Sequence, residues 1–524
     1  MESASGEGDA AEADVRRSSA IHVSLLLLDF RVTLFIDNRM PDDNGNVLSD
    51  IAPGSISRIH LVGVAGTGMG SFAGMLKAAG YHVTGSDESV YPPMSDMLAA
   101  WGVDVMTPYS PANIDAARPD LVIIGNVIRR VNVEATAVRE RGIPQMSFPA
   151  AFGSLVLAGK HSVVVAGTHG KTTSSALMSH VLVSAGTDPT FLVGGVTLNY
   201  TGNFRNGSGP FVVVEGDEYD TAYFDKGPKF MHYRARTAII TSVEFDHADI
   251  YRDMAHYESA YDTFCATLPE NGFLAVAASY PNAVAIAQRS SRAYVATYAA
   301  TGNAEYVAEN QRFGPDGARF NIREPRGAVG EFLLPMSGHH NVENAVGVYA
   351  AGRALGLGAD TIRAGFATFS GVKRRQEIRG DVGGVLVIDD FAHHPTAVRE
   401  TITAIRLRYP DRRLWAVFEP RSNTSRRNIH QIEYTTAFTG AARASIREPE
   451  PHDKVPVDER LDIGRVVDSL REQGIDADAS PDVAELLDRV AGGARLGDVI
   501  LVMSNGAFGG FIPSLLERLS ARFG

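Results

Sequence analysis

Residues 163–173, which read VVVAGTHGKTT, decide the fold of this chain. An apolar, β-branched run ends here in a glycine turn, and a helix-like stretch follows from Ser174 to Ala185. This order predicts a loop that holds nucleotide phosphates, because backbone N–H groups at a helix N-terminus point towards an anion. The general pattern has a glycine five residues before Gly170, where this chain has Val165. An ordinary turn before a helix is the alternative interpretation.

Candidate ATP and Mg²⁺ ligands lie in this loop and after two later strands. Lys171 would place positive charge on the β- and γ-phosphates, and the Thr172 hydroxyl would bind Mg²⁺. The apolar strand Phe211–Val214 runs into Glu215-Gly216-Asp217-Glu218, and an acid beside a phosphate loop is where Mg²⁺ is usually held. A second acid-rich segment spans residues 244–249. Taken singly, each acidic cluster is equally well explained as a solvated loop.

Length and composition indicate a globular protein. A chain of 524 residues has room for about three domains. The net charge of −12 argues against a nucleic-acid-binding surface, and a single cysteine, Cys265, suits a reducing cytoplasm. The stretch Ala20–Ile36 is too short and too polar to span a bilayer, and the acidic leader Met1–Asp14 lacks the basic start of a signal peptide. We therefore expect a soluble cytoplasmic protein with no membrane partner.

The chain is predicted to be α/β, with three consecutive domains after an N-terminal extension. Residues 1–57 form the extension: Met1–Ser19 is predicted to be disordered, Ile21–Ile36 to form one or two strands, and Pro41–Ser57 to be a linker. Residues 58–159 are predicted to form a Rossmann-like domain. Residues 160–376 are predicted to form a central ATPase-type domain with the phosphate loop, and residues 377–524 a second Rossmann-like domain.

The first domain opens with a glycine-rich turn. The strand Ile59–Val62 is followed by a glycine-rich segment at residues 63–70 and by a helix, and Asp87 lies near the spacing of a ribose-binding acid. Ala65 takes the middle position of Gly-x-Gly-x-x-Gly, where a glycine normally lets a pyrophosphate approach the backbone. A tight turn without a ligand is the alternative.

The last domain has polar segments at its predicted strand ends. The strand Val385–Ile388 precedes Asp389 to Thr396, and the strand Trp415–Phe418 precedes Glu419 to Thr424. A final strand, Val499–Val502, leads into Met503 to Gly510, and open α/β sheets bind ligands at such ends. Just before this domain, the basic segment Gly371–Arg375 is either a solvated turn or a clamp on phosphate oxygens.

Together these motifs resemble the Mur ligases, the ATP-dependent amide-forming enzymes of peptidoglycan precursor synthesis. The phosphate loop looks like that family's variant, which lacks the upstream glycine. The family's motifs are matched, in order, by Glu215 to Glu218, Glu244 to Asp249, His340-Asn341-x-x-Asn344, Arg374-Arg375 and Asp389 to Thr396. The resemblance covers residues 58–524.

The resemblance implies a reaction with two candidate amine substrates. The favoured reaction, through an acyl phosphate, joins the murein tripeptide L-alanyl-γ-D-glutamyl-meso-diaminopimelate to UDP-N-acetylmuramate in peptidoglycan recycling. This choice depends on four stretches, residues 85–95, 218–226, 419–424 and 503–510. The alternative adds L-alanine to the same nucleotide. A nicotinamide-dependent oxidoreductase or an ATP-gated binding protein would leave several of these motifs unexplained. Whether the protein is a monomer or a dimer is left open.

The resemblance also implies roles for individual residues, with ATP and Mg²⁺ as cofactors. The candidate catalytic residues are Lys171, Glu215, His247, Arg375 and His394, and the Mg²⁺ ligands are Thr172, Glu215 and His247. ATP would contact Gly167, Thr168, His169, Gly170, Lys171, Thr172, Thr173, Asn341, Asn344, Arg375 and Asp390, with Asp390 facing either the ribose or the hinge. The UDP-sugar would contact Gly63, Ala65, Gly66, Thr67, Gly68, Met69, Asp87, Asn126 and Arg129. The peptide would contact Arg421, Ser422 and Asn423.

One departure from the family concerns a second metal position. Several Mur ligases carry a carbamylated lysine about fifteen residues after the histidine that matches His247. Here that place falls at or near Asp262, and the chain has no lysine between Lys229 and Lys373. A carbamylated lysine is therefore not expected, and whether a carboxylate or water replaces it is left open.

Overall fold

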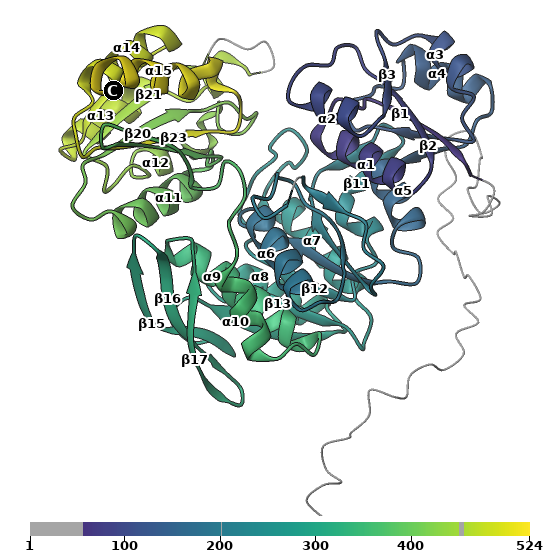
Figure 1. Ribbon diagram of the computed structural model, residues 1–524, viewed down its shortest axis with the longest axis horizontal. Coiled ribbons are helices and arrows are strands. Elements are labelled where there is room, and N and C mark those ends of the chain that lie inside the picture. Colours follow the sequence, from purple (N-terminus) through teal and green to yellow (C-terminus); the bar gives the residue numbers. More distant parts are fainter. Residues whose placement is uncertain (1–55, 201, 450–454) are drawn as a thin grey trace, which may run out of the picture. The chain divides into compact units, whose positions relative to one another are not determined.

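The computed structural model describes residues 56–200, 202–449 and 455–524 (Figure 1). Along this part of the chain, three main α/β sheets follow one another in sequence order. The expectations for Met1–Ser19, Ile21–Ile36 and nearly all of Pro41–Ser57 lie outside the described residues.

The first sheet is parallel, with strand order β3-β2-β1-β4-β5. This is the order of one half of a Rossmann fold, in which the chain reverses direction beside the first strand. The glycine-rich turn predicted from the sequence joins β1 to α1, at the carboxyl edge of the sheet. The strands are β1 (Arg58–Val62), β2 (His82–Ser86), β3 (Asp104–Met106), β4 (Leu121–Ile124) and β5 (Gln145–Ser147), and the helices are α1 (Thr67–Ala78), α2 (Met94–Ala100), α3 (Pro111–Ala117), α4 (Val133–Glu140) and α5 (Phe148–Leu155).

The central sheet has ten strands in the order β17-β16-β15-β14-β13-β12-β6-β9-β7-β8. Its middle is parallel, and β6 lies between β12 and β9, so the phosphate loop opens at the centre of the carboxyl edge. The strands are β6 (His161–Ala166), β7 (Thr190–Leu192), β8 (Phe204–Arg205), β9 (Phe211–Gly216), β12 (Thr237–Ile240), β13 (Phe273–Ala277), β14 (Tyr294–Ala299), β15 (Tyr306–Gly314), β16 (Gly317–Glu324) and β17 (Gly327–Leu334).

Helices pack on both faces of the central sheet, and a small hairpin precedes one of its strands. The helices are α6 (Lys171–Ser184), α7 (Met254–Thr267), α8 (Pro281–Ser290), α9 (His339–Ala354) and α10 (Ala359–Ala367). The hairpin pairs β10 (Asp220–Ala222) with β11 (Asp225–Pro228), and the 3₁₀ turn η3 (Lys229–His232) follows it. The strands β15, β16 and β17 form an antiparallel extension at one edge of the sheet (Figure 1).

The strand β6 explains why an unbroken apolar run precedes the phosphate loop. Val164 and Ala166 belong to one apolar cluster of the sheet, and Val163 and Val165 belong to the cluster on the other face. All four are fully buried, because helices cover both faces of a parallel sheet. Val165 therefore lies inside the strand, and a glycine there would weaken the sheet.

The last sheet has the order β18-β19-β23-β20-β21-β22, with only β18 antiparallel to its neighbour. The strands are β18 (Glu377–Val382), β19 (Val385–Asp390), β20 (Leu414–Glu419), β21 (Arg443–Arg447), β22 (Asp476–Ser480) and β23 (Val499–Ser504). The helices are α11 (Pro395–Arg408), α12 (Gln431–Tyr434), α13 (Ile463–Glu472), α14 (Val483–Gly493) and α15 (Phe511–Phe523), with short 3₁₀ turns η4 (Asn428–His430), η5 (Val457–Glu459) and η6 (Phe508–Gly510).

Several strands of the last sheet extend further than the sequence indicates. Asp389 and Asp390 were expected to follow a strand, but they are the last residues of β19 and pair with Val502 and Met503. Glu419 likewise belongs to β20. Parallel pairing with β23 continues through all three positions, and the three side chains are buried.

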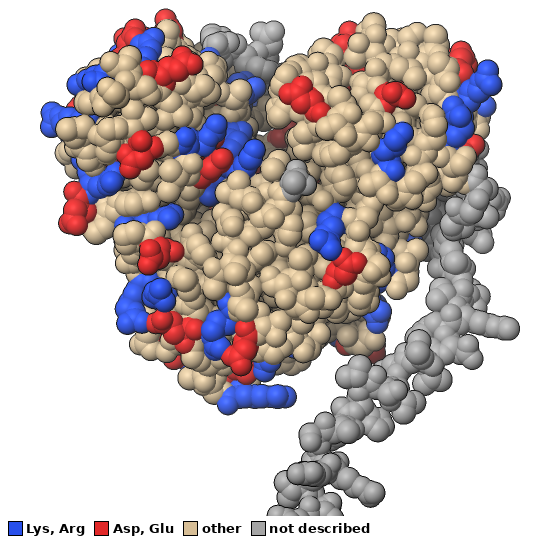
Figure 2. Space-filling view, in the orientation of Figure 1, with Lys and Arg blue, Asp and Glu red and all other residues tan. Residues whose placement is uncertain are grey.

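Basic and acidic side chains are interspersed on the face of the molecule drawn in Figure 2. Exposed ion pairs include that of Arg312 with Glu331, on the strands β15 and β17. Among the described residues, no helix is both long and apolar enough to cross a membrane.

Candidate active site

The phosphate loop forms a tight turn between β6 and α6. Gly167 and Gly170 have φ values of 133° and 78°, which L-side chains rarely adopt. A Cβ at Gly167 would lie 2.2 Å from Thr241 Oγ1, and one at Gly170 would lie 2.5 Å from Asn344 Oδ1. No side chain caps the first turn of α6. The loop therefore presents helix-terminal N–H groups in the way that a phosphate needs.

Glu215 faces the start of α6 from the neighbouring strand. Its carboxylate accepts hydrogen bonds from Thr172 Oγ1 at 3.0 Å and from the Gly194 amide at 2.8 Å. Burial, together with the nearby Asp217 carboxylate, raises the pKa of Glu215. A half-buried carboxylate next to a hydroxyl is an oxygen-ligand pair of the kind that Mg²⁺ prefers, so the residues present fit that metal.

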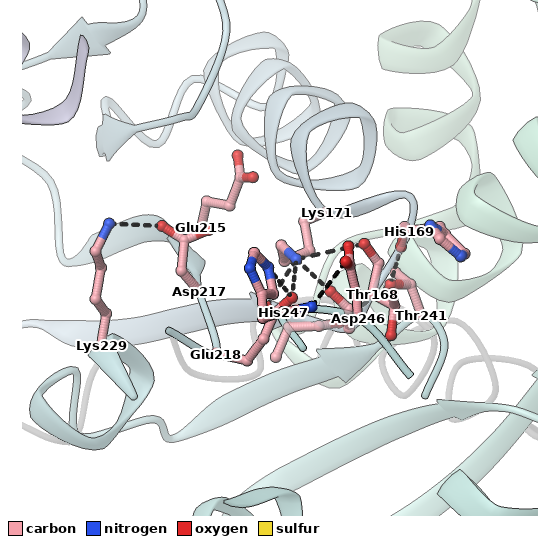
Figure 3. Close-up of polar contacts among 12 residues, drawn as sticks. Thr168, His169, Lys171, Glu215, Asp217, Glu218, Lys229, Thr241, Asp246 and His247 are labelled. Atoms are coloured by element: carbon pink, nitrogen blue, oxygen red, sulfur yellow. Dashed lines mark hydrogen bonds and ion pairs between the residues drawn. The ribbon is translucent and has the colours of Figure 1, made fainter. Parts of the chain in front are cut away.

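Glu218 connects the loop lysine to the predicted histidine ligand (Figure 3). Lys171 Nζ lies 2.8 Å from Glu218 Oε2 and donates to the Gly167 carbonyl at 2.5 Å. His247 Nε2 lies 3.3 Å from Glu218 Oε1. Burial alone would lower the pKa of His247, but the Glu218 carboxylate outweighs it and raises the pKa to about 9. Burial would also lower the pKa of Lys171, but the carboxylates around it, Glu218 first, outweigh burial and raise it.

A second buried ion pair lies beside these groups. Lys229, from η3, donates to Asp217 Oδ2 at 2.9 Å and lies 4.1 Å above the centre of the Tyr219 ring. Only 9% of Lys229 is exposed, so its charge depends on the paired carboxylate. Sequence reasoning assigned no role to Lys229 or Glu218. Glu218 could have been selected, since it lies in the same acidic segment as Glu215, whereas nothing local distinguishes Lys229.

Arg375 reaches the same place from the segment between the central and last sheets. Its Nη2 donates to Thr172 Oγ1 at 3.3 Å. The residues on either side, Arg374 and Gln376, have φ values of 60° and 54°. This unfavourable backbone is held because the Gln376 amide donates to Asp390 Oδ2 at 2.8 Å, and the Ala392 amide donates to Asp390 Oδ1. Asp390 thus faces the hinge, which is the segment between the central and last sheets. This was one of its two expected positions.

A cavity of about 900 Å³ is lined by residues from the central and last sheets and from helices beside the first sheet. Of the predicted site residues, it is lined by Thr67, Gly68, Thr168, His169, Gly170, Lys171, Thr172, Thr173, Glu215, His247, Asn341, Asn344, Arg375, Asp390, Ser422 and Asn423. The residues that do not line it are Gly63, Ala65, Gly66, Met69, Asp87, Asn126, Arg129, Gly167, His394 and Arg421.

In the first sheet, Asp87 organises the glycine-rich turn. Its Oδ2 accepts the Ala65 amide at 2.8 Å, and its Oδ1 accepts the Tyr109 hydroxyl at 3.1 Å. Asn126 and Arg129 are exposed. The Asp87 carboxylate therefore already stabilises the turn, whatever else it contacts.

In the last sheet, Arg421 packs against the segment after β23. A Cβ at Gly506 would lie 1.7 Å from Arg421 Nη1, so the guanidinium occupies the space that a larger residue would need. Asn423 donates to Asp249 Oδ2 of the central part of the chain at 3.1 Å. Two of the three predicted peptide contacts thus line the cavity, and the third is held beside it.

Family models match three successive parts of the chain. The model described as "Mur ligase family, catalytic domain" matches residues 58–160, "Mur ligase middle domain" matches residues 165–352, and "Mur ligase, glutamate ligase domain" matches residues 374–506. A ligase of Haemophilus influenzae, named UDP-N-acetylmuramate–L-alanyl-γ-D-glutamyl-meso-2,6-diaminoheptandioate ligase, is 34% identical over 471 residues. That match covers 89% of this chain and 100% of the relative. The chain belongs to the Mur ligase family.

Other relatives agree with this membership. A UDP-N-acetylmuramate–L-alanine ligase of Salinibacter ruber is 33% identical over 457 residues, which cover 87% of this Mur ligase and 93% of the relative. The crystal structure of a murein peptide ligase from Psychrobacter arcticus is 33% identical and superposes with a TM-score of 0.65, covering 88% of this chain and 98% of the other. The predicted three-domain α/β fold and the predicted class of enzyme, an ATP-dependent ligase, are confirmed.

The position expected for a carbamylated lysine lies outside the site of this Mur ligase. Asp262 accepts hydrogen bonds from Arg289 at 2.8 Å and from Ser290 at 2.6 Å, and it does not line the cavity. The carboxylate that lies next to His247 is Glu218 instead. What replaces the lysine was left open by the sequence, and the structure places Asp262 on α7, on a side that faces α8.

Proposed function

We propose that this Mur ligase joins the tripeptide L-alanyl-γ-D-glutamyl-meso-diaminopimelate to UDP-N-acetylmuramate. The observation that carries the proposal is the match over the full length of the Haemophilus influenzae relative, whose name states that reaction. The cavity supports it, because all three α/β units of the chain contribute residues to one space. The addition of L-alanine, named for the Salinibacter ruber relative, is the second candidate.

The reaction needs an activated carboxylate, because oxide is too poor a leaving group for an amine to displace. ATP would supply the phosphoryl group that converts the lactyl carboxylate into an acyl phosphate, and the peptide amine would then displace phosphate. Lys171 and Arg375 would neutralise charge on the transferring group, and such catalysis depends on positioning and electrostatics. Glu218 would keep Lys171 protonated and in place, since its carboxylate is 1% exposed and pairs with the ammonium group.

The metal ligands follow from the same geometry. Thr172 and Glu215 would hold one Mg²⁺, and His247 would contribute to a second. Bound Mg²⁺ would neutralise phosphate charge. Because His247 pairs with Glu218 in this structure, it would have to give up a proton before it could bind a metal.

The remaining assignments rest on the resemblance together with this placement. Residues 58–159, 160–376 and 377–524 would be the three domains. Thr67 and Gly68 would approach the UDP-sugar, Asn341 and Asn344 the adenine, and Ser422 and Asn423 the peptide. Arg421 would pair with a peptide carboxylate. The protein would act in the cytoplasm.

The substrate is tested by phosphate release with ATP, Mg²⁺ and UDP-N-acetylmuramate. L-alanine and the meso-diaminopimelate tripeptide are compared as amines, and product masses are measured in each case. We expect turnover with the tripeptide. Turnover with L-alanine alone would assign the chain to the second candidate, and NADH binding without phosphate release would contradict both.

Lys171 is tested with a matched double variant. We expect Lys171→Ala to lower the rate of phosphate release at least about 100-fold, the scale on which lost transition-state charge stabilisation is felt. It should also destabilise the fold, because the buried Glu218 carboxylate would keep only one of its two cationic partners, His247. Lys171→Ala with Glu218→Gln should recover stability, measured by urea unfolding, but not activity. An active Lys171→Ala variant would contradict the assignment.

A further inference from the structure

Three side chains from distant segments form a cluster beside the phosphate loop. His169 belongs to the loop itself, Glu244 follows β12, and His394 precedes α11 of the last sheet. His169 Nε2 lies 2.7 Å from Glu244 Oε2, and His394 Nδ1 lies 3.9 Å from the same oxygen. One ligand atom from each residue lies within 4.8 Å of the other two. The His169 and His394 ring centres are 4.5 Å apart.

An ion pair between His169 and Glu244 does not account for this whole arrangement. His394 is 6% exposed, and its Nε2 has no hydrogen-bond partner among the described residues. Its Nδ1 accepts only a long bond, 3.3 Å, from the Thr396 amide. His430 packs against His394 with ring centres 4.5 Å apart, and its buried Nε2 also lacks a partner in the described part of the chain. Buried imidazoles left without partners are costly, and a bound ligand would relieve that cost.

We propose that His169, Glu244 and His394 form a binding site for a divalent cation of the Zn²⁺ class. Two imidazoles and one carboxylate make a three-ligand set that leaves a fourth position open, as zinc tolerates. Mg²⁺ prefers an all-oxygen, octahedral environment, so this site selects a different metal from the one that Thr172 and Glu215 suit. The two sites share no residue.

Because of where the cluster lies, a bound cation affects the activity of the enzyme. His169 lies between Thr168 and Gly170 of the phosphate loop, and His394 is the N-cap residue of α11. Thr396 Oγ1 already donates to Glu244 Oε1 at 3.1 Å. A cation held by all three ligands ties α11 to the phosphate loop, and it therefore inhibits a reaction that needs the loop to take up and release nucleotide.

The site is tested by titrating the metal-free full-length protein with Co²⁺ alone, without nucleotide. We expect visible absorption bands of a low-coordinate Co²⁺ ion at one equivalent, persistence of the bands in excess Mg²⁺, and their loss when Zn²⁺ is added. His394→Gln and Glu244→Gln should each weaken Co²⁺ binding at least about 10-fold, since even changes around metal ligands have that effect. The matched controls His82→Gln, at an exposed strand end, and His247→Gln should keep the bands.

Several results would overturn the proposal. Absence of the Co²⁺ bands in the unmodified protein is one, and loss of the bands in His247→Gln with retention in His394→Gln is another. If the cluster variants do not fold, X-ray absorption of the Zn²⁺-loaded unmodified protein decides. A first shell with two imidazoles and a carboxylate supports the site, and an all-oxygen shell contradicts it. Phosphate release inhibited by Zn²⁺ and restored by a zinc-selective chelator in excess Mg²⁺ would show the functional consequence.

Discussion

At the scale of single residues, the charge balance of the site depends on Glu218. Its carboxylate lies between Lys171 and His247, within 3.3 Å of both, and is almost completely buried. Burial would raise the pKa of Glu218, but the Lys171 ammonium and the hydrogen-bonded His247 together outweigh burial and lower it. The two cations and the carboxylate therefore hold one another in their charged forms in the absence of ligands.

This arrangement predicts that the difference in stability between the unmodified protein and a His247 variant depends on pH. The folded-state pKa of His247 is about 9, above the value of about 6.5 in an unfolded chain, so protonation favours the folded state. Its contribution to the free energy of unfolding should be fully present below about pH 6.5 and lost as the pH rises through about 9. We expect metal-free His247→Asn to be less stable than the unmodified protein by on the order of 2 kcal/mol at pH 6. The difference should vanish near pH 10, as measured by urea unfolding.

The control for this titration is His82→Asn, since His82 is exposed. Its stability should follow that of the unmodified protein at every pH. A difference between His247→Asn and the unmodified protein that stays constant from pH 6 to pH 10 would show that the charged pair with Glu218 does not form.

Gly506 gives a second residue-scale prediction. An alanine Cβ there would meet the end of the Arg421 side chain, which can move away, so Gly506→Ala should displace Arg421 without unfolding the protein. We expect the KM for the tripeptide to rise at least about 10-fold, as when a charge-assisted contact worth about 1.5–3 kcal/mol is lost. The KM values for ATP and UDP-N-acetylmuramate should stay the same in steady-state assays. Equal increases for all three substrates would contradict the role of Arg421.

At the scale of elements, the helix α1 packs closely against the end of α2 and against β8 of the central sheet. Gly74, in the middle of α1, leaves room for Trp101 at the end of α2 and for Phe204 on β8 of the central sheet. The two rings meet edge to face with their centres 5.1 Å apart. A small residue here lets the helix approach both rings, so the glycine serves packing rather than backbone freedom.

Gly74→Ala tests this packing. The Cβ would lie 2.5 Å from the Trp101 ring, and overpacking costs about 1–3 kcal/mol, which exceeds the gain of about 1 kcal/mol from helix propensity. We expect a net loss of stability in urea unfolding. The matched control is Gly492→Ala in α14, where a Cβ meets nothing within 4 Å and a small gain is expected. A stabilised Gly74→Ala variant would contradict the close packing.

At the scale of the whole molecule, the cavity depends on contacts between segments far apart in the sequence. Arg375 contacts Thr172, Thr396 contacts Glu244, and Asn423 contacts Asp249. Residues of the central and last sheets and of helices beside the first sheet line the same space. Ligands in this space should therefore affect segments outside the phosphate loop.

Hydrogen–deuterium exchange tests that expectation. With Mg²⁺ and a non-hydrolysable ATP analogue, we expect slower exchange in residues 167–173 and also in residues 373–376 and 390–396. At 100 times its Kd, the analogue should raise the free energy of unfolding by about 2.7 kcal/mol. The variant with both Lys171→Ala and Glu218→Gln is the control and should show weaker protection. Slowing confined to residues 163–185 would contradict a shared site.

Local patterns predicted a large part of this structure. The predicted strands over Ile59–Val62 and Phe211–Val214 lie in β1 and β9, and the glycine-rich turns after β1 and β6 lie where the spacing indicated. Asp389 and Glu419 were expected beyond their strands, because acids usually mark loops, but pairing with neighbouring strands keeps them in the sheet. Short strands such as β7 and β10 lack a periodic pattern and were not predicted.

By itself, the sequence determined the nucleotide-binding loop, the order of three α/β units and the family, because each depends on residues close together in the chain. Only the tertiary structure decided which charges meet. Glu218 lies beside His247, Lys229 pairs with Asp217, and His394 lies beside His169. These pairs join residues from different turns and sheets, and their energies depend on burial and distances that no local pattern contains.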